Sequence, residues 1–456
     1  MSFEAQKPLI LPLFAATVMR GWSWKRLDEI AKVYDCPHST PQLVNDQSAP
    51  FVVRSQDVRT GTILLGNVAH VSLETYLDRI KRVEPEYGDL VYSREGTYFG
   101  IAAEIPKKVK VCLGQRMVLI RPDSTIVNHS FLKYWLNSPQ LFGHVHGFRD
   151  GTVAERLNLP VIRGLAIAFP PLKEQKRIAE ILSALDDRTA LLRETNVTLE
   201  AIAQALFKAW FVDFDPVRAK QEGRLPQGMD EATAALFPER LEESSLGFVP
   251  LGWPTGSVGD FAQQKKGSVS PLDSPETLFE HYSLPAFDNA QAPVMEAGSE
   301  IKSNKTPLPL EAVLLSKLNP HIPRVWLPVQ HGINAVCSTE FLAFAPCGGS
   351  SKEFIYCFFS SPGFLQRLCQ VVTGTSNSHQ RVKPDQVSTF PCVVPPMAVL
   401  EAFTAVVRPM FERVYENRVQ AQTLATVRDT LLPRLISGQL RLLSAVEESV
   451  EVMTGT

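Results

Sequence analysis

Two matching stretches decide the architecture of this chain. Residues 170–211 read PPLKEQKRIAEILSALDDRTALLRETNVTLEAIAQALFKAWF, and residues 395–436 read PPMAVLEAFTAVVRPMFERVYENRVQAQTLATVRDTLLPRLI. They align without a gap at an offset of 225 residues, so that Arg188 matches Arg413. Internal repetition on this scale describes architecture rather than a single site. The sequence therefore predicts two matched long helices, each preceded by a larger segment.

Apolar residues recur every seven positions along both stretches. About forty helical residues at 1.5 Å each form a rod of roughly 60 Å. A helix of that length with one apolar stripe needs a partner. We expect the two helices to pack as an antiparallel coiled coil, and the expected helix-pairing residues are Ile178, Leu185, Leu192, Leu199 and Leu206 in the first and Phe403, Met410, Leu424 and Leu431 in the second.

Polar and helix-breaking residues interrupt this regular pattern. Thr189 and Asn196 lie in the first seam and Asn417 in the second, where buried polar groups can fix the register. Pro409 lies inside the second stretch, so we expect it to kink the helix or to replace part of its first turns. The two helices should therefore differ near the start of the second.

The segments in front of the helices resemble each other loosely. Both contain short β-like runs broken by Gly, Pro, Asn and Asp, which is typical of an α+β fold. Ser138-Pro139 matches Ser361-Pro362 at an offset of 223 residues. The expected parts are an N-terminal globular segment (1–169), a first helical region (170–212), a linker (213–250), a second globular segment (251–394), a second helical region (395–440) and a polar tail (441–456). The chain is thus a tandem repeat with pseudo-twofold symmetry.

Composition is that of a folded soluble protein. A length of 456 residues exceeds one ordinary core, and 45% hydrophobic with 21% charged residues are usual values for folded domains. No run of eighteen apolar residues occurs, so we expect no membrane span. Seven cysteines without a CxxC spacing suggest reduced thiols, which favours a cytoplasmic location.

Charge is distributed unevenly between the two globular segments. Residues 20–169 contain 19 Lys and Arg against 15 Asp and Glu, a balance of +4. Residues 252–395 contain 10 against 11, a balance of −1. The first segment is mildly basic, which weakly supports a phosphate-binding surface.

The chain contains no convincing catalytic motif. Its Pro-Pro pairs occur as FPPL (169–172) and VPPM (394–397), without the Asn or Asp and the aromatic ring of the adenine methyltransferase motif. They are better interpreted as helix starts. No P-loop is present, and Pro122-Asp123 with Glu174 and Lys176 matches a nuclease pattern only by chance. His144 and His146 lack further ligands at zinc spacing, so no metal site and no catalytic residue are predicted.

Nucleic-acid recognition is the positive interpretation. Arg, Lys, Asn, Gln and His side chains in Gly-rich loops can reach base edges and phosphates. The stretch 373–381, TGTSNSHQR, is dense in hydrogen-bond donors, although an ordinary solvated loop has a similar composition. The candidate DNA-binding residues are Arg94, Tyr98, Arg149, Thr152 and Arg156 in the first segment and Lys265, Lys266, Lys317, Asn319, Thr375, Asn377, His379, Gln380 and Arg381 in the second.

Four motifs in order along the chain resemble one known family. They are PPLKEQKRIA (170–179), WFVDFDP (210–216), LGFVPLGW (246–253) and LLPRLISG (431–438). With the duplicated architecture, they make the chain resemble the specificity subunit of Type I restriction-modification systems over nearly its whole length. The second Pro-Pro block departs from the pattern, because it continues Met397-Ala398-Val399-Leu400-Glu401. Docking at the second repeat is therefore expected to differ in detail.

The resemblance implies a division of labour among subunits. Each globular segment would be an α/β target-recognition domain that reads one half of a bipartite double-stranded DNA sequence. The paired helices would set the spacing and dock two modification subunits, which methylate adenine. The chain itself would bind no cofactor, whereas its partners would use S-adenosylmethionine, ATP and Mg²⁺, and restriction subunits would add translocation and cleavage. The expected complex is thus both an adenine-specific methyltransferase and a restriction endonuclease.

Two other classes of function stay open at this point. A coiled-coil adaptor or scaffold that binds no DNA would share the helical pattern. An independent methyltransferase is disfavoured by the missing motifs. Salt-dependent DNA binding separates the adaptor from the DNA reader.

Overall fold

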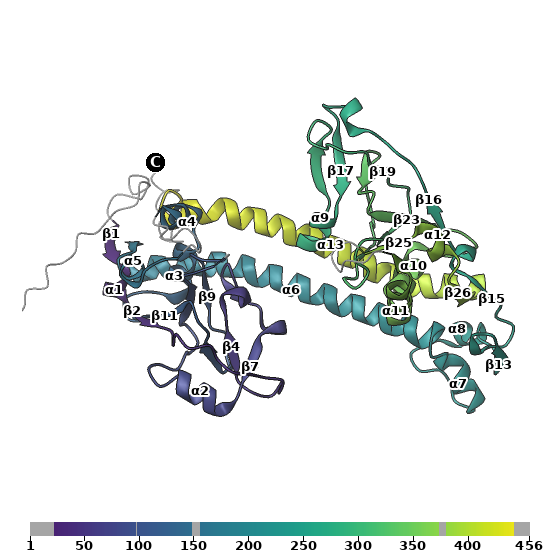
Figure 1. The fold of residues 1–456 in the computed structure, drawn as a ribbon, viewed down its shortest axis with the longest axis horizontal. Helices are drawn as coiled ribbons and strands as arrows, with labels where there is room; N and C mark the ends of the chain where they lie inside the picture. The colour runs from purple at the N-terminus through teal and green to yellow at the C-terminus, as the bar shows by residue number, and fades with distance from the viewer. Residues whose placement is uncertain (1–21, 97, 148–155, 374–379, 442–456) are drawn as a thin grey trace, which may run out of the picture. The chain divides into compact units, whose positions relative to one another are not determined.

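The computed structural model describes residues 22–96, 98–147, 156–373 and 380–441 (Figure 1). The chain separates into two compact units. Unit 1 comprises residues 1–189 and 422–456, and unit 2 comprises residues 190–421. Each unit therefore combines one globular segment with a portion of both long helices.

The two long helices form as the sequence predicts. Helix α6 spans Leu172–Phe211 and helix α13 spans Met397–Ile436, and each contains 40 residues. Both begin just after a Pro-Pro pair, where the missing proline N–H costs no intrahelical bond. The expected loss of the first turns at Pro409 is wrong, because α13 runs through it without a break. Pro409 and Ala405, whose carbonyl loses its intrahelical bond, are both exposed, so water can satisfy that oxygen.

Unit 1 is built from short strands and helices around two four-stranded sheets. The first sheet has the order β2-β11-β8-β9 and the second has the order β10-β4-β7-β3. A separate antiparallel pair, β1-β12, joins the start of the globular segment to the residues in front of α6. The elements are β1 (Ser23–Arg26), α1 (Leu27–Ile30), β2 (Ala31–Asp35), β3 (Leu43–Val44), β4 (Phe51–Val53), β5 (Val58–Arg59), β6 (Thr62–Ile63), β7 (Ala69–Val71), α2 (Leu73–Arg79), β8 (Leu90–Ser93), β9 (Ala102–Glu104), β10 (Val111–Leu113), β11 (Met117–Pro122), α3 (His129–Leu136), α4 (Pro139–His146), α5 (Leu159–Arg163) and β12 (Ala166–Phe169).

Unit 2 repeats this plan. Its sheets have the orders β16-β23-β20-β21 and β18-β17-β22-β19, and its separate pair is β15-β26. The elements are α7 (Asp215–Gln221), α8 (Glu231–Ala235), β13 (Leu241–Ser244), β14 (Gly247–Pro250), β15 (Thr255–Ser257), β16 (Ala262–Lys265), β17 (Leu278–Tyr282), α9 (Leu284–Ala290), β18 (Val294–Ala297), β19 (Thr306–Pro307), β20 (Val313–Ser316), β21 (Val325–Trp326), β22 (Ala335–Cys337), β23 (Phe341–Pro346), α10 (Lys352–Phe359), α11 (Pro362–Gln370), β24 (Val372–Thr373), β25 (Arg381–Val382), α12 (Pro384–Ser388) and β26 (Pro391–Val393).

Equivalent elements follow each other in the same order in the two units. The first sheet of unit 1 corresponds strand by strand to that of unit 2, with β2, β8, β9 and β11 equivalent to β16, β20, β21 and β23. In both sheets every pair of neighbouring strands is antiparallel. Helices α3 and α4 correspond to α10 and α11, and Ser138 and Ser361 cap α4 and α11 in the same way. The duplication predicted from the helices therefore extends to the first sheet and to the two helices that follow it in each globular segment, whereas the second sheets differ in where their parallel pair lies.

In unit 1 the beginning of α6 packs against the end of α13. Ile178, Ala179 and Leu182 share one buried cluster with Leu432 and Leu435. Arg428 donates a hydrogen bond to Asp186 at 2.8 Å. Numbering rises along one helix as it falls along the other, so the pairing is antiparallel.

In unit 2 the end of α6 packs against the beginning of α13, again antiparallel. The Phe403 ring lies 6.2 Å from Phe207 and 5.1 Å from Phe211. Asn196 and Asn417 lie farther along and are buried against each other. The buried seam of α6 contains Leu192, Asn196, Ala203, Phe207 and Trp210, while Leu199 and Leu206 are only half-buried.

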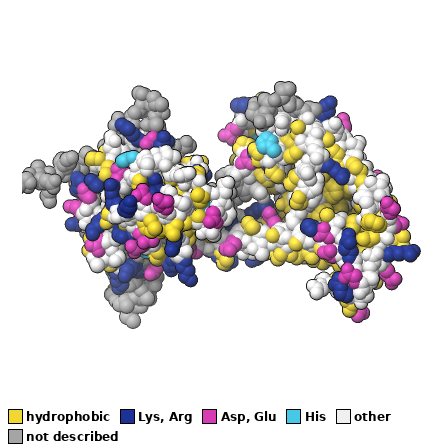
Figure 2. Space-filling model, turned by 60° about the horizontal axis from the view of Figure 1, so that its bottom comes forward, with side chains coloured by type: hydrophobic (Ala, Val, Ile, Leu, Met, Phe, Trp, Pro, Cys, Tyr) yellow, Lys and Arg dark blue, Asp and Glu magenta, His cyan; other side chains and the backbone are white. Residues whose placement is uncertain are grey.

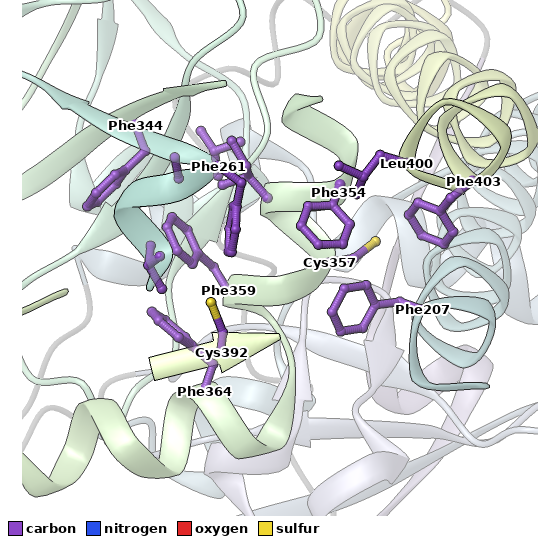
Figure 3. Close-up of a cluster of buried hydrophobic side chains, with 14 of the residues drawn as sticks. Phe207, Phe261, Phe344, Phe354, Cys357, Phe359, Phe364, Cys392, Leu400 and Phe403 are labelled. Atoms are coloured by element: carbon purple, nitrogen blue, oxygen red, sulfur yellow. The ribbon is translucent and has the colours of Figure 1, made fainter. Parts of the chain in front are cut away.

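An aromatic core joins the helices of unit 2 to its sheets (Figure 3). In this view Phe207 from α6 and Phe403 from α13 lie beside Phe354 of α10, with Phe359, Phe364 and Phe344 deeper in the domain. Phe354 and Phe359 are at most 1% exposed. Fully burying such side chains contributes about 1.5–3 kcal/mol each. The helices are therefore part of the globular core rather than an attached rod.

Residues 213–250 are folded, contrary to the linker expected from their composition. They form α7, α8 and the β13-β14 hairpin, and Phe214, Val217 and Phe237 are buried in the core of unit 2. Gly223, Gly228 and Gly247 adopt positive φ angles, so these residues serve tight turns. The acidic surface side chains and the turn glycines of this segment led to the wrong prediction of a linker.

Candidate nucleic-acid interface

In unit 1 several strand ends meet at one edge of the first sheet. Strand β8 ends at Ser93, which pairs with Met117 at the start of β11, and Val118 pairs with Asp35 at the end of β2. An eight-residue connection, residues 94–101, leads from β8 to β9 at this edge. Loops at one end of a rigid sheet are suited to binding because the scaffold fixes their positions.

The same edge recurs in unit 2. Strand β20 ends at Ser316, which pairs with Phe341 at the start of β23, and β16 ends nearby at Lys265. The connection from β20 to β21, residues 317–324, again contains eight residues. Candidate residues from three separate parts of the chain are thus gathered at this edge.

Equivalent backbone hydrogen bonds hold the residue that follows β8 or β20. The Arg94 N–H donates to Arg116 O at 3.1 Å, and Arg94 O accepts from Leu157 N–H at 2.8 Å. In unit 2 the Lys317 N–H donates to Glu340 O at 2.9 Å, and Lys317 O accepts from Val382 N–H at 3.0 Å. We call this arrangement the loop clamp. The backbone hydrogen bonds of the loop clamp are the same in the two units, whereas its side chains differ.

Positive φ angles explain one further match between the loops. Gly96 has φ of 94° and its counterpart Asn319 has φ of 50°. Glycine and asparagine tolerate the left-handed region best. Asn319, predicted to contact DNA, therefore also has a backbone role at this turn.

The candidates in unit 1 lie around its loop clamp. The Arg94 side chain is 18% exposed and lies 3.4 Å from an Asp35 carboxylate oxygen. Arg156 is exposed and its backbone forms a bridge with Glu95. Tyr98 is 39% exposed, and the Arg59 guanidinium lies over its ring. The predicted contacts Arg149 and Thr152 lie outside the described residues.

The candidates in unit 2 also converge. Arg381 is exposed, forms a backbone bridge with Leu318, and donates two hydrogen bonds to Glu340 at 3.0 and 3.1 Å. The Gln380 carbonyl accepts from Asn319 N–H. Lys265 is half-buried, whereas Lys266 is exposed and lies 3.1 Å from Asp385 of α12. Thr375, Asn377 and His379 lie outside the described residues.

Sequence reasoning missed three charged residues at these edges. Arg116 and Glu340 are the equivalent residues in front of β11 and β23, and Arg116 lies 3.2 Å from Glu95. Arg59 comes from the β5-β6 hairpin, far from the loop in sequence. Arg116 could have been found from the sequence, because it is a basic residue that lies between a glycine turn and the start of a strand. No local pattern could have indicated Arg59.

Side-chain charges are mixed over the face of unit 1 that Figure 2 shows. Lys and Arg side chains alternate there with Asp and Glu side chains, at the left of the view, rather than forming one basic surface. This face therefore carries no continuous basic surface. This agrees with the small excess of +4 in the sequence of the segment.

His144 and His146 lie in the last turn of α4. His146 packs against Phe99 and Phe142 with ring centroids 4.4 and 3.9 Å apart, and burial lowers the pKa of His144. Among the described residues, no group of three His, Cys, Asp or Glu side chains is placed to hold a metal ion. No helix in the described part of the chain is long and apolar enough to cross a bilayer.

Comparisons with known proteins agree with this architecture. A family model described as the Type I restriction modification DNA specificity domain matches residues 19–201. The Type I restriction enzyme HindI specificity subunit of Haemophilus influenzae is 24% identical over 443 residues, covering 84% of this chain and 94% of that protein. The MjaIX specificity subunit of Methanocaldococcus jannaschii is 25% identical over 340 residues, covering 71% of each.

A solved structure extends the likeness to the fold. The crystal structure of the Type I restriction-modification system S subunit from M. genitalium superposes with a TM-score of 0.53 at 14% identity, covering 95% of this chain and 100% of that one. The family model, the two relatives and this fold agree with the motifs at residues 170–179, 210–216, 246–253 and 431–438. By these comparisons the chain is similar to the specificity subunits of Type I restriction-modification systems.

Proposed function

We propose that this chain reads a bipartite DNA sequence, one half with each globular segment. The observation that carries the proposal is the loop clamp, which both units place at the same edge of the same sheet. Its backbone is equivalent in the two units, but Arg94 and Arg116 are replaced by Lys317 and Glu340. A fixed backbone with different side chains suits recognition of two unlike half-sites, because side chains read the base edges.

The paired helices supply the second part of the proposal. They would hold the two readers apart at a set distance and dock two modification subunits. The chain would then act without catalysis of its own, and the modification subunits would supply S-adenosylmethionine and methylate adenine. Restriction subunits would add ATP- and Mg²⁺-dependent translocation and cleavage. The proposal rests on similarity to this family and on the absence of a catalytic motif from the sequence.

The test compares adenine methylation in host cells with and without this gene. We expect a two-part motif to be methylated only when the full chain and its modification subunit are both present. The purified complex should also bind DNA with an affinity that falls steeply with salt, by about 0.9 log unit per log unit of salt for each phosphate contacted. An unchanged set of methylated motifs together with no DNA binding would contradict the proposal and favour an adaptor role.

A further inference from the structure

One basic side chain in unit 1 differs from the others near its loop clamp. The Arg59 guanidinium carbon lies 4.1 Å from the centroid of the Tyr98 ring. Arg59 is on strand β5, whereas Tyr98 is on the connection between β8 and β9. The Gly61 N–H donates to Ala102 O at 2.9 Å, so the β5-β6 hairpin is fastened beside β9. The pair is thus formed by two segments that the sheet brings together.

Hydrogen bonds hold the Arg59 guanidinium and close the connection that carries Tyr98. Arg59 Nη1 donates to Gln56 O at 2.8 Å and to Val58 O at 2.9 Å. The Tyr98 connection is closed by Gly100 N–H, which donates to Ser93 O at 2.7 Å. The guanidinium plane is therefore held before any ligand binds, which reduces the entropy cost of using it.

The fixed orientation leaves one edge of the guanidinium for a ligand. Because Nη1 binds the backbone, the Nε and Nη2 edge is the fork that remains. Arg381 and Arg324 use that same Nε and Nη2 edge to bind the carboxylates of Glu340 and Asp288. Within the described part of the chain, Arg59 forms no ion pair with a carboxylate.

We propose that Arg59, held on the Tyr98 ring, reads a guanine in the half-site bound by unit 1. A two-donor fork matches the O6 and N7 acceptors of guanine in the major groove. Arg94 and Arg116 are less suited, because Asp35 and Glu95 already lie within 3.4 and 3.2 Å of them. This assignment rests on the proposed function and adds a specific residue and base to it.

Unit 2 has a different side chain at the equivalent place. The connections have equal length, so the residue equivalent to Tyr98 is His321. The guanine contact is therefore assigned to unit 1 alone. A change at Arg59 should alter one half-site and leave the other unchanged.

Four variants of the full chain, each in complex with the modification subunit, test the assignment. Arg59→Lys keeps the charge but loses the fork, and Arg59→Gln loses both. Tyr98→Ala removes the platform, whereas Tyr98→Phe keeps the ring. The matched control is Lys107→Gln with Tyr87→Ala, a second cation–π pair in unit 1 with Lys107 Nζ 4.7 Å from the ring centroid. Tyr87 precedes β8 and Tyr98 follows it, so the control lies toward the opposite end of that strand.

The readouts are methylome sequencing and competition binding with single-base variants of the target. For Arg59→Lys and Arg59→Gln we expect one G·C position of one half-site to lose preference by roughly tenfold. Tyr98→Ala should weaken the same position, while Tyr98→Phe and the control pair should keep the wild-type motif. The other half-site and the spacer should stay the same in all variants.

Three results would overturn the assignment. In the first, no G·C pair in either half-site of the wild-type motif changes its preference when Arg59 is substituted, so there is no guanine for the Arg59 fork to bind. Unchanged preference in both Arg59→Lys and Tyr98→Ala excludes the contact. Equal loss at both half-sites with a lower melting temperature indicates that Arg59 only supports the Ser55–Asp57 turn. Absence of any bipartite motif in the wild type would instead contradict the proposed function itself.

Discussion

Gln175 shows how one residue fastens a long helix to its globular segment. It is fully buried near the start of α6, where Nε2 donates to Pro170 O at 2.9 Å and to Ile126 O at 3.2 Å, and Oε1 accepts from Asn128 N–H at 2.9 Å. The equivalent residue in α13 is Leu400, which packs into the aromatic core. The departure of the second Pro-Pro block from the family pattern thus replaces a hydrogen-bonded attachment with an apolar one.

Replacing Gln175 with Ala should destabilise unit 1. Three backbone groups lose their partner, one in a buried and two in part-buried hydrogen bonds, and a buried group left unsatisfied costs about 1–3 kcal/mol. Because water can enter part of the space, we expect a loss of about 2–4 kcal/mol in the free energy of unfolding, measured by guanidinium denaturation. Gln204→Ala, a half-buried glutamine later in the same helix, is the control and should change it much less. Equal effects of the two substitutions would contradict the anchoring role.

Glu104 makes the stability of unit 1 depend on pH. Burial raises the pKa of its carboxyl, but the hydrogen bond from His129 and the charges of Lys133 and His129 outweigh burial and hold the pKa below its usual 4.5. His129 Nδ1 and Lys133 Nζ lie 3.0 and 3.2 Å from the carboxylate. A carboxyl with a depressed folded pKa contributes stability above its unfolded pKa and loses it as the pH falls through the folded pKa.

Glu104→Gln should therefore remove part of the acid sensitivity. We expect the variant to be less stable than wild type at pH 7 and the difference to shrink as the pH falls from 4.5 through the lower folded pKa. Thermal unfolding at a series of pH values measures this. Glu74→Gln, at an exposed position in α2, should follow the wild-type profile. A constant difference between wild type and Glu104→Gln across that window would show that the ionised pair contributes nothing.

At the scale of elements, a buried asparagine pair interrupts the apolar seam between α6 and α13. Asn196 Nδ2 donates to Val414 O at 3.1 Å, and Asn417 Nδ2 donates to Asn196 Oδ1 at 2.8 Å. In the described structure Asn417 Oδ1 is buried without a hydrogen-bond partner. Such a pair favours one alignment of two helices at some cost in stability.

Single and double substitutions should separate these two effects. Asn196→Leu alone leaves the buried Asn417 amide without its partner, so we expect a loss of about 1–3 kcal/mol. The double variant Asn196→Leu with Asn417→Leu should be close to wild type or more stable, because both polar partners are removed. Guanidinium denaturation of the two single variants and the double variant gives the coupling energy. Additive losses would mean that the two side chains do not act as a pair.

The helices and the duplication could be predicted from sequence because both are carried by local or repeated patterns. The seven-residue spacing around Leu182 and Asn196 needs no knowledge of distant contacts. The sheets could not be predicted, because their strands are only two to six residues long and pair across large separations, such as β1 with β12. Local composition also misled at residues 213–250, where turn glycines and acidic surface side chains hid a folded subdomain.

The candidate site was predictable only in outline. Arg94, Lys317 and Arg381 were identified from loop composition, and the structure gathers each of them at a sheet edge. Arg59 was missed because only the fastening of the β5-β6 hairpin beside β9 brings it to Tyr98. Asn319 combines a candidate side chain with a left-handed backbone, which composition alone cannot reveal.

At the scale of the whole molecule, the duplication separates what is kept from what varies. The long helices match at a constant offset of 225 residues, and each unit contains an antiparallel pairing of the two. The loop clamps keep their backbone hydrogen bonds but exchange Arg116 for Glu340. Partners that are two copies of one subunit require equal docking surfaces, whereas two unlike half-sites require different side chains. The proposed function requires this combination of similar helices and different loop side chains.

Lengthening both helices together tests whether they set the distance between the half-sites. Inserting two helical turns near Asn196 and near its counterpart Ala421 keeps the seven-residue spacing in both helices. Each insertion adds about 11 Å of helix, and duplex DNA rises about 3.4 Å per base pair. We therefore expect methylome sequencing to show a spacer longer by about three base pairs, with both half-sites unchanged. The same insertion in α6 alone is the control and should abolish methylation, because the two helices no longer match. An active complex with an unchanged spacer would show that the helices do not act as a ruler.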